Sequence, residues 1–339
     1  MSFIIDKSKF TPCFENKNKL TVTSHPENYD VIFESASLNF TDKDVVLVDS
    51  NVKRLYNISH KRMIEIDATE ENKSMETALL VCEKLLKFHF DKGNTLIVIG
   101  GGILQDIGAF VSKMFKRGIK WTYYPTTLLS QCDSCIGGKT ALNFKDFKNQ
   151  LALFSAPQKV VIDTKFLETL SERDILSGHG EIVKLFLTGG EEYVDMFDGL
   201  SLDEKIYHSL AIKKEVVEKD EFELLERKSL NYGHSFGHSI ESATNYSICH
   251  GEAVLLGIEI INQLFDNNPK ITEMVEKFTS LSRLQCCNME QVFEITKTDK
   301  KVKDGVITLV VVREPGLTEF VPTKLDEALK ERVCAISIN

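Results

Sequence analysis

The first half of the chain alternates short apolar runs with amphipathic segments. Four apolar runs are bounded by polar or turn residues and are predicted to be buried strands: Asp44–Asp49, Asn94–Ile99, Lys120–Tyr124 and Val160–Asp163. Two segments between them carry apolar residues at helical spacing and are predicted to be helices: Met75–Phe88 and Ile103–Phe115. Strands that alternate with helices form a parallel sheet covered on both faces. The first half is therefore expected to be an α/β domain of the Rossmann-like type.

In the second half, apolar residues recur at helical spacing over long stretches. Five helices are predicted: Arg173–Leu187, Asp203–Leu224, Leu230–Thr244, Glu252–Phe265 and Ile271–Ser280. A late strand is predicted at Val306–Val312, as one arm of a hairpin after Asp304 and Gly305. We expect a parallel-sheet domain over residues 1–168 and a mostly α-helical domain over residues 169–339. Ligand sites often form between domains, so we expect the active site in the cleft between these two domains.

Composition narrows the class of protein. The 339 residues are 42% hydrophobic and 27% charged, which is typical of a globular protein. The formal net charge of -9 disfavours nucleic-acid binding, which depends on neutralising phosphates. The chain shows no apolar run of the ~20 residues that span a membrane, and no secretory signal is predicted. The eight cysteines are scattered along the chain, which indicates a reducing, cytoplasmic location.

Three histidines carry the strongest chemical signal. His234 and His238 are four residues apart, so they share one face of a helix. His250 follows within seventeen residues of His234, although the whole chain holds only eight histidines. Imidazoles with one carboxylate form a common zinc site, in which three protein ligands leave a position open for substrate. The cluster therefore predicts a metal site.

The carboxylate for that site is predicted to be Glu181, which lies in an otherwise apolar helical segment. A buried carboxylate is costly unless it is paired or bound to metal. The alternative is that Glu181 and Lys184, three residues apart, form an ion pair on a solvated helix surface. His179 is a weaker candidate for a fourth ligand.

A glycine run and an acidic strand end indicate a dinucleotide site. Gly100, Gly101 and Gly102 separate a predicted strand from a predicted helix, which places backbone N–H groups beside a diphosphate. The run lacks the G-x-G-x-x-G spacing, so a plain tight turn is the alternative. Asp49 ends an earlier strand, where it could accept a hydrogen bond from a ribose hydroxyl or cap the next helix.

The segment from Thr126 to Asn149 is expected to be a loop that binds an anionic ligand. Gly137, Gly138 and Lys139 resemble part of a phosphate loop, but Asp133 stands where that motif needs glycine, so a P-loop NTPase is not expected. The cationic groups of the segment suit a phosphate or carboxylate ligand. The alternative is a solvated basic loop that binds no ligand. Cys132 and Cys135 have the C-x-x-C spacing of a redox pair or of half a zinc site, but no second C-x-x-C completes a structural zinc site. Small buried residues are the favoured interpretation, and a redox pair is the weaker alternative.

Together these residues resemble one family, the 3-dehydroquinate synthases among the sugar phosphate cyclases. The resemblance runs from about Asp44 to Val312 and rests on motifs in a fixed order: GGGILQD, RG followed by PTTLLSQ-x-D, GGKTALN, KN, VIDT, GEIVK, LNYGHSFGH and HGE. The chain departs from the family pattern at Cys135, His179 and Gly180, where the family usually has serine, an apolar residue and alanine. Residues 144–147 lack the usual proline and glycine.

The resemblance implies a role for each matching residue. The implied zinc ligands are Glu181, His234 and His250. The implied catalytic residues are His238, Lys139, Lys184, Asp133, Asn149 and Lys148. The implied substrate-binding residues are Lys213, Arg227, Asn231, Lys300 or Lys301, and Arg117 from the neighbouring subunit of a homodimer. The implied NAD-binding residues are Asp49, Asn51, Glu70, Lys73, Gly101, Gly102, Asp106, Thr126, Thr127, Phe166, Thr169 and Leu170.

The implied reaction converts 3-deoxy-D-arabino-heptulosonate 7-phosphate to 3-dehydroquinate and phosphate. NAD is reduced and then reoxidised within one turnover, and zinc, which cobalt can replace, acidifies the substrate alcohol. A related cyclase acting on sedoheptulose 7-phosphate is the first alternative; Lys213, Arg227 and Asn231 favour a substrate with a carboxylate. A metal-dependent alcohol dehydrogenase of related fold is the second alternative, and a binding module without turnover is the third. No membrane association is expected.

Overall fold

The computed structural model describes residues 4–7, 18–145, 147–265 and 267–336. These residues form two compact units. The sheet unit contains residues 18–171, and the helical unit contains residues 4–7 with residues 172–336. From the sequence we expected the N-terminus to belong to the first domain. Instead, the N-terminal strand pairs with a strand near the C-terminus, so residues 4–7 fold with the helical unit.

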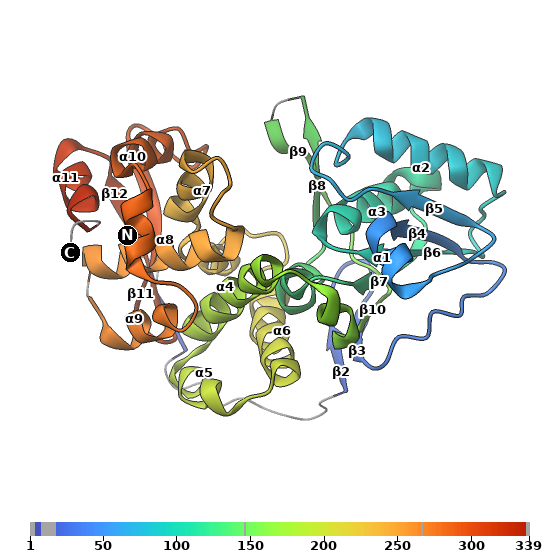
Figure 1. The fold of residues 1–339 in the computed structure, drawn as a ribbon, viewed down its shortest axis with the longest axis horizontal. Helices are drawn as coiled ribbons and strands as arrows, with labels where there is room; N and C mark the ends of the chain where they lie inside the picture. Colours follow the sequence, from blue (N-terminus) through green and yellow to red (C-terminus); the bar gives the residue numbers. More distant parts are fainter. Residues whose placement is uncertain (1–3, 8–17, 146, 266, 337–339) are drawn as a thin grey trace. The chain divides into compact units, whose positions relative to one another are not determined.

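The sheet unit is built around seven strands in the order β2-β3-β10-β7-β6-β4-β5 (Figure 1). Their bounds are β2 (Lys19–Val22), β3 (Tyr29–Phe33), β4 (Val45–Asp49), β5 (Met63–Ile66), β6 (Thr95–Gly100), β7 (Lys120–Pro125) and β10 (Lys159–Ile162). β2 is antiparallel to β3, and the other neighbouring pairs are parallel. The four predicted strands and the parallel sheet are confirmed, whereas β2, β3 and β5 were not predicted.

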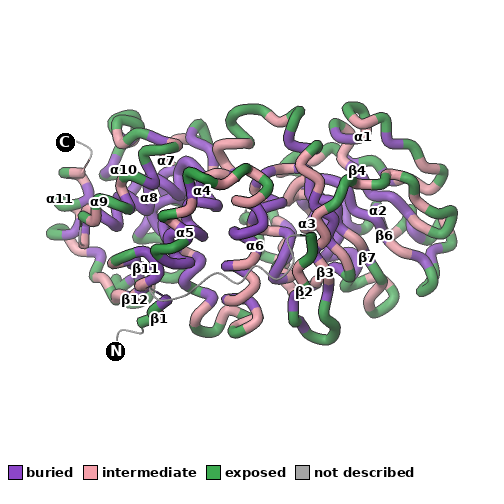
Figure 2. Tube along the Cα trace, turned by 90° about the horizontal axis from the view of Figure 1, so that it is seen from below, coloured by how far each residue is buried: buried purple, intermediate pink, exposed green. Residues whose placement is uncertain are grey.

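Helices cover both faces of this sheet. They are α1 (Ser50–Tyr56), α2 (Met75–Lys87) and α3 (Gly102–Met114), with the short helices η1 (Phe115–Arg117), η2 (Ser130–Ser134) and η3 (Thr164–Thr169). On one face, Val46 and Val48 of β4 pack with residues of α1 and η3. On the other face, α3 lies against β6 so closely that a Cβ atom on Gly108 would be 2.6 Å from the Val98 side chain. The central strands are buried on both sides (Figure 2).

A hairpin extends from the sheet unit where we expected a loop. β8 (Lys139–Phe144) and β9 (Phe147–Phe154) pair with each other in a separate antiparallel sheet. The expectation of a loop was wrong because Thr140 and Leu142 alternate with more exposed residues, a strand pattern that we did not recognise. Phe144 and Phe147, the two ends of the altered segment, pair with each other near the tip and are 50% and 66% exposed.

The helical unit is arranged around α8, which is buried along almost its whole length (Figure 2). Its helices are α4 (Glu172–Gly189), α5 (Glu191–Met196), α6 (Leu202–Lys219), α7 (His234–Ala243), α8 (His250–Phe265), α9 (Pro269–Glu276), α10 (Met289–Lys297) and α11 (Glu327–Ile336), with η4 (Phe197–Gly199), η5 (Glu226–Asn231) and η6 (Leu281–Cys286). A three-stranded sheet completes the unit in the order β1 (Ile4–Asp6), β12 (Leu317–Lys324), β11 (Val306–Glu314). The predicted late strand is confirmed as β11, but its hairpin partner is the following strand.

Three predicted helices begin or end several residues away from the predicted positions. The helix expected to continue to Leu224 ends at Lys219, because the Asp220 carboxylate accepts backbone hydrogen bonds from the next turn and stops the helical pattern. The helix expected from Leu230 begins only at His234, because Gly233 has a left-handed φ of 78°. The helix expected over residues 271–280 is α9, which ends at Glu276.

A buried lysine ties the N-terminal strand to the helical unit. The Lys7 ammonium lies 3.7 Å from Glu215 of α6 and 3.8 Å from Glu226 of η5, and its side chain is 8% exposed. Lys219 contacts the same two carboxylates, at 2.7 and 3.7 Å. Burial lowers the pKa of Lys7, and the two glutamates oppose that shift. The four charges therefore join three segments that are distant in the sequence.

We expect Lys7→Met to lower the free energy of unfolding by about 1–3 kcal/mol, because it leaves two partly buried carboxylates with one cation. Urea unfolding of the whole protein measures the change. Lys270→Met is the matched control, since Lys270 pairs with Glu191 on the exposed surface and such pairs contribute about 0–1 kcal/mol. Equal effects of the two substitutions would contradict a stabilising role for Lys7.

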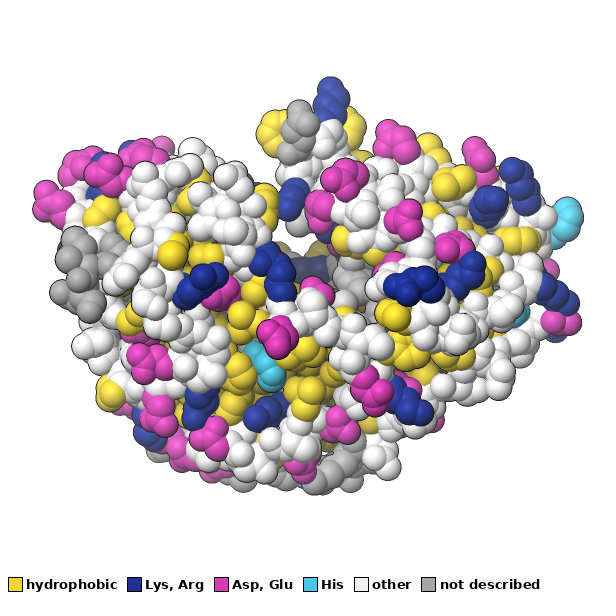
Figure 3. Space-filling view, in the orientation of Figure 1, with side chains coloured by type: hydrophobic (Ala, Val, Ile, Leu, Met, Phe, Trp, Pro, Cys, Tyr) yellow, Lys and Arg dark blue, Asp and Glu magenta, His cyan; other side chains and the backbone are white. Residues whose placement is uncertain are grey.

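The surface carries interspersed acidic and basic side chains on the face shown in Figure 3. Among the described residues, no helix is long and apolar enough to cross a lipid bilayer. The seven described cysteines are free thiols. Cys132 and Cys135 are both buried, and their thiols donate to the backbone carbonyls of Leu129 and Gln131, which favours the packing interpretation of this pair.

Candidate metal and substrate site

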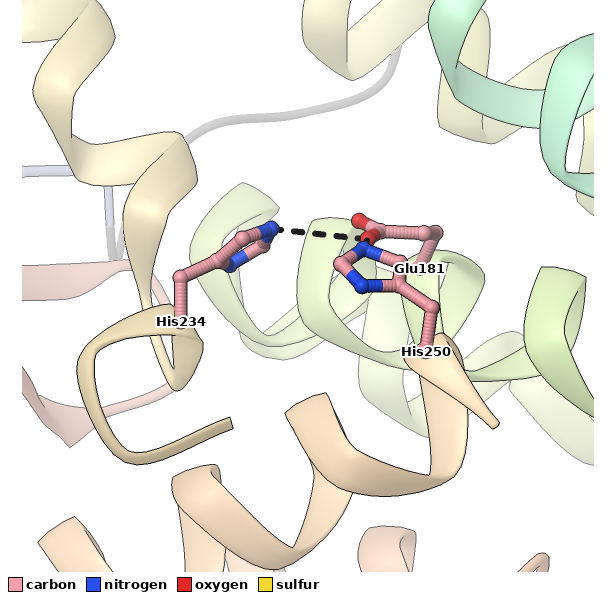
Figure 4. Close-up of side chains that lie close together, drawn as sticks. All are labelled: Glu181, His234 and His250. Atoms are coloured by element: carbon pink, nitrogen blue, oxygen red, sulfur yellow. Dashed lines mark hydrogen bonds and ion pairs between the residues drawn. The ribbon is translucent and has the colours of Figure 1, made fainter. Parts of the chain in front are cut away.

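Glu181, His234 and His250 converge at one point of the helical unit (Figure 4). They come from α4, the start of α7 and the start of α8. Glu181 Oε1 lies 2.9 Å from His250 Nε2 and 3.5 Å from His234 Nε2. Ligands bound at about 2.1 Å around a tetrahedral metal lie about 3.4 Å apart. The donor set and its spacing therefore fit a divalent metal ion with one coordination position left for another ligand.

Both histidines are oriented by contacts on the far side of their rings. His234 Nδ1 lies 3.1 Å from the Tyr232 carbonyl oxygen, which fixes the proton on Nδ1 and leaves Nε2 as the ligand atom. His250 Nδ1 lies 3.1 Å from the Glu241 carboxylate. A carboxylate behind a histidine is a common way to orient a metal ligand and raise its basicity. These contacts support the fit of the three residues to a metal.

Charges around Glu181 keep it ionised. Its side chain is 2% exposed, and burial alone would raise its pKa, but Lys184 and His234 outweigh burial and hold the pKa of Glu181 well below its usual range. Lys184 forms an ion pair with the second carboxylate oxygen and is itself buried. The predicted surface pair of Glu181 and Lys184 is therefore present as a pair, but it lies in the interior.

Close backbone contacts set the position of the three side chains. α4 crosses α8 where a Cβ atom on Gly180 would lie 2.2 Å from the Gly251 carbonyl oxygen. α7 crosses α8 where a Cβ atom on Gly257 would lie 2.1 Å from the Gly233 carbonyl oxygen. Because only glycine permits helices to approach so closely, these crossings bring Glu181 and both histidines together. The glycine at position 180, a departure from the family pattern, has a direct structural reason here.

We expect Gly251→Ala to weaken metal binding at least about tenfold and to lower thermal stability, because overpacking of this kind forces backbone shifts. The new Cβ would lie 2.1 Å from the Ser177 carbonyl oxygen, and the backbone of α8 would have to move beside His250. Metal content and thermal unfolding measure the effect. Gly199→Ala is the control because its Cβ would meet no atom within 4 Å. Full metal content in Gly251→Ala would contradict the role assigned to this helix crossing.

Of the other predicted residues of the helical unit, His238 lies near this group. The His238 ring lies 5.2 Å from the His234 ring and 5.9 Å from the His250 ring, measured between centroids. Burial lowers the pKa of His238, and nearby positive charges lower it further, including that of Lys301 from the predicted pair Lys300 and Lys301. Lys213 of α6 is buried. Among the described residues, a second group that could hold a metal ion is His238, Glu241 and His250. His179 belongs to neither group, and its ring stacks on Phe278 at 4.3 Å.

The segment before α7 is held by one carboxylate. Asp220 accepts hydrogen bonds from the backbone N–H groups of Leu224, Leu225 and Arg227, at 2.8, 2.7 and 3.0 Å. The Arg227 guanidinium is buried and donates to the Glu221 carbonyl oxygen. Partial burial would raise the pKa of Asp220, but the three N–H donors lower it. The segment is therefore locally ordered around Arg227.

Asn231 lies at the end of the same segment. Its amide nitrogen donates to the Glu223 carboxylate at 2.9 Å, and Glu223 has a left-handed φ of 60°.

Sequence reasoning missed Glu223 and Glu241. Glu241 follows His234 by seven residues and His238 by three, so helical spacing alone could have placed it on the same face.

In the sheet unit, most residues predicted to bind a dinucleotide lie at or after the carboxyl ends of parallel strands. Asp49 ends β4, Gly101 and Gly102 follow β6, and Thr126 and Thr127 follow β7. This edge of an open α/β sheet is where ligands commonly bind. A Cβ atom on Gly101 would lie 2.9 Å from the Thr127 side chain, so the glycine permits a close approach.

Asp49 and the predicted dinucleotide residues in and after η3 make contacts within the protein. The Asp49 carboxylate caps α1 by accepting a hydrogen bond from the Asn51 N–H at 3.1 Å. Helix capping was the alternative to ribose binding in the sequence analysis. Phe166 is buried in the core beneath α1, where its ring contacts Tyr56. Thr169 lies 3.1 Å from the Tyr56 hydroxyl, and Leu170 is the C-cap residue of η3.

A polar network connects the last predicted dinucleotide residues to the hairpin. Lys73 lies 2.6 Å from Asp106 of α3. Burial raises the pKa of Asp106, and Lys73 opposes that shift. Asp106 accepts a hydrogen bond from the Ala141 N–H, and Glu70 accepts one from the Asn143 amide at 2.8 Å. The hairpin is therefore anchored to this part of the sheet unit.

The hairpin and its neighbourhood carry the predicted phosphate-binding groups of the sheet unit. Lys139 begins β8, and Lys148 and Asn149 lie early in β9; all three are exposed. Asp133 is half-buried in η2. Arg117 is exposed at the end of η1, after α3, with a left-handed φ of 64°.

Family models match most of the chain. The model described as 3-dehydroquinate synthase N-terminal matches residues 63–177, and the model described as 3-dehydroquinate synthase C-terminal matches residues 178–302. The chain belongs to the 3-dehydroquinate synthase family. A 3-dehydroquinate synthase of Pelagibacter ubique is 32% identical, covering 88% of this chain and 93% of its own. Another from Dictyoglomus turgidum is 36% identical, covering 78% and 79%. The resemblance seen in the sequence is confirmed.

Solved structures share the fold at lower identity. A 2-deoxy-scyllo-inosose synthase complexed with carbaglucose-6-phosphate, NAD+ and Co2+ matches with a TM-score of 0.79 and 19% identity, over 94% of this chain and 99% of its own. A Streptomyces hygroscopicus 2-epi-5-epi-valiolone synthase with NAD+ and Zn2+ bound matches at 0.76 and 23%, over 94% and 98%. A probable glycerol dehydrogenase from Sinorhizobium meliloti matches at 0.58 and 15%, over 87% and 90%. The α/β fold with a helical second part is thus shared, while these identities do not separate the activities.

Proposed function

We propose that this chain is a 3-dehydroquinate synthase that converts 3-deoxy-D-arabino-heptulosonate 7-phosphate to 3-dehydroquinate and phosphate, with NAD and a divalent metal ion as cofactors. Membership of the 3-dehydroquinate synthase family supports the reaction. The observation that carries the proposal is the convergence of Glu181, His234 and His250 in a geometry that fits one metal ion. The proposed place of this reaction is the shikimate pathway, in aromatic amino acid biosynthesis.

We propose zinc as the metal, which cobalt can replace, held by Glu181, His234 and His250. The donor set of two imidazoles and one carboxylate supports zinc. When bound, the ion would make the substrate alcohol more acidic and so assist its oxidation by NAD. Glu241 and the Tyr232 carbonyl would keep the Nε2 atoms of the two histidines directed at the ion.

We propose that the polar residues around these cofactors hold the anionic groups of the substrate. In the helical unit, buried Lys184, Lys213 and Arg227 offer three cations, and Asn231 offers an amide that Glu223 orients. In the sheet unit, Lys139, Lys148 and Asn149 are exposed on the hairpin and Asp133 is half-buried beside it. Fixed cations of this kind stabilise phosphate as it leaves and the enolate that then closes the ring. His238, beside the two histidine ligands, is suited to move a proton near the leaving phosphate.

The proposed dinucleotide site is the carboxyl edge of the sheet, with the residues implied by the resemblance. Asp49, Gly101 and Thr126 support it because they follow three neighbouring parallel strands. We also propose a homodimer in which Arg117 reaches the substrate phosphate of the other subunit, which the exposed position of Arg117 supports. A cytoplasmic location is proposed because the described cysteines are free thiols.

Phosphate release tests the function directly. The protein is incubated with NAD, Zn²⁺ or Co²⁺ and either the seven-carbon sugar acid phosphate or sedoheptulose 7-phosphate. We expect phosphate and 3-dehydroquinate in equal amounts from the first substrate, with no net formation of NADH. Faster cyclisation of sedoheptulose 7-phosphate would assign the chain to a related cyclase. Stoichiometric NADH without phosphate would assign it to the alcohol dehydrogenases.

A further inference from the structure

Asn143 makes hydrogen bonds in three directions within the sheet unit. Its amide nitrogen donates to the Glu70 carboxylate at 2.8 Å and to the Glu70 carbonyl oxygen at 3.2 Å. Its amide oxygen accepts from the Asn149 N–H at 2.9 Å. Its own backbone N–H donates to the Lys73 carbonyl oxygen at 2.8 Å. One side chain of β8 therefore holds the segment after β5 on one side and the start of β9 on the other.

The two partners of Asn143 belong to different parts of the proposed site. Glu70 and Lys73 are proposed to contact the dinucleotide, whereas Asn149 is proposed to contact the sugar phosphate. Neither the motifs nor the comparisons gave Asn143 a role of its own. Its bond to Asn149 reaches a residue whose φ of 56° is left-handed, a conformation that needs support from its surroundings. The position of the Asn149 side chain thus depends on the Asn143 amide.

A second contact anchors the same hairpin to the same polar network. The Thr140 hydroxyl donates to the Asp106 carbonyl oxygen at 2.8 Å, and the Ala141 N–H donates to the Asp106 carboxylate at 3.2 Å. Asp106 in turn pairs with Lys73 at 2.6 Å. These contacts hold β8 in place, and the Asn143 side chain also reaches β9.

We propose that Asn143 is a positioning residue that couples the dinucleotide-binding segment around Glu70 and Lys73 to the substrate-binding start of β9. A dinucleotide that fixes Glu70 also fixes the Asn143 amide, and the amide then holds Asn149 in the conformation that receives the sugar phosphate. Bound cofactor therefore raises the affinity for substrate without contacting β9. The inference rests on the proposed function, because both ligands are taken from it.

Hydrogen exchange and steady-state kinetics on the zinc-loaded full chain test this coupling. In the wild type, NAD is expected to slow exchange of the backbone amides of β8 and β9. In Asn143→Ala, NAD is expected to protect the segment around Glu70 but no longer β9. KM for the sugar acid phosphate is expected to rise about tenfold while kcat and metal content change little, since a lost hydrogen bond is worth about one factor of ten.

Two further variants separate positioning from general damage to the fold. Asn143→Asp keeps an acceptor for the Asn149 N–H but sets a carboxylate against Glu70, so it is expected to uncouple NAD from β9 like Asn143→Ala. Asn72→Ala is the matched control, because Asn72 donates to the Asp67 carbonyl oxygen in the same segment. Asn72→Ala is expected to keep the wild-type KM and the NAD-dependent protection of β9.

The outcomes are distinct. Wild-type KM and wild-type protection of β9 in both Asn143 variants would overturn the coupling and leave the proposed function standing. NAD-dependent protection that Asn143→Ala abolishes, in a protein that does not turn over the sugar acid phosphate, would support the coupling and reject the proposed function. A wild-type protein that binds no NAD would reject both.

Discussion

Replacing His250 by alanine is expected to abolish metal uptake and turnover together. His250 Nε2 lies 2.9 Å from Glu181, and its Nδ1 atom is held by Glu241, so the ring is oriented as a ligand. Loss of a Lewis acid removes several kcal/mol of transition-state stabilisation, which corresponds to a loss of at least about a thousandfold in turnover. Metal content of the purified protein and the rate of phosphate release are the two measurements.

A control separates loss of a ligand from loss of structure. His179→Ala removes a different histidine, which lies in α4 two residues before Glu181 and stacks on Phe278. It is expected to retain one metal ion per chain and to keep most of its turnover. Full metal content in His250→Ala, or loss of metal in His179→Ala, would contradict the proposed ligand set.

Replacing Lys139 by alanine is expected to leave metal content unchanged and to lower turnover about a hundredfold, as removal of one fixed charge-stabilising group does in other enzymes. Lys139 begins β8 in the sheet unit, whereas the three proposed metal ligands belong to the helical unit. Phosphate release at saturating NAD measures the loss of turnover, and metal analysis of the same sample tests whether the metal content is unchanged.

Lys145→Ala provides a matched control on the same hairpin. Lys145 lies near the tip, with its ammonium 5.5 Å from the centre of the Phe144 ring, and has no proposed part in binding. Its removal takes the same charge from the same hairpin and is expected to change turnover by less than about twofold. If Lys139→Ala retained wild-type kinetics, or if both substitutions were equally harmful, Lys139 would have no specific place in the site.

The metal group could be predicted from the sequence because its signals are local. His234 and His238 share a helix face by spacing alone, and Glu181 stands out as a carboxylate in an apolar segment. The strands that end at Asp49 and at the glycine run were also predictable, because buried parallel strands appear as continuous apolar runs. The motifs then related these separate signals to one family.

Other features depend on contacts between distant segments. Nothing near Gly180 in the sequence indicates that the Gly251 backbone lies so close that it leaves no room for a Cβ atom on Gly180. The N-terminal strand joins the helical unit through β12 and through Lys7, whose partners lie more than two hundred residues away. The missed hairpin shows a further limit, because Lys148, Asn149 and Gln150 interrupt the apolar pattern of β9 and none of its residues is fully buried.

Helix ends were predicted poorly for a related reason. The apolar pattern of α6 continues past Lys219, but Asp220 offers its carboxylate to the following backbone N–H groups and stops the helix. The pattern of α7 extends back to Leu230, but Gly233 adopts a left-handed conformation that a helix cannot contain. In both places a single local interaction outweighs the periodicity on which the prediction rested.

Anomalous diffraction at the absorption edge of the bound metal, measured on crystals of the zinc- or cobalt-loaded protein, tests the metal site most directly. One peak is predicted, at about 2.0–2.2 Å from Glu181 Oε1 and from the Nε2 atoms of His234 and His250. A catalytically active protein whose metal lies away from these three atoms would contradict the proposal.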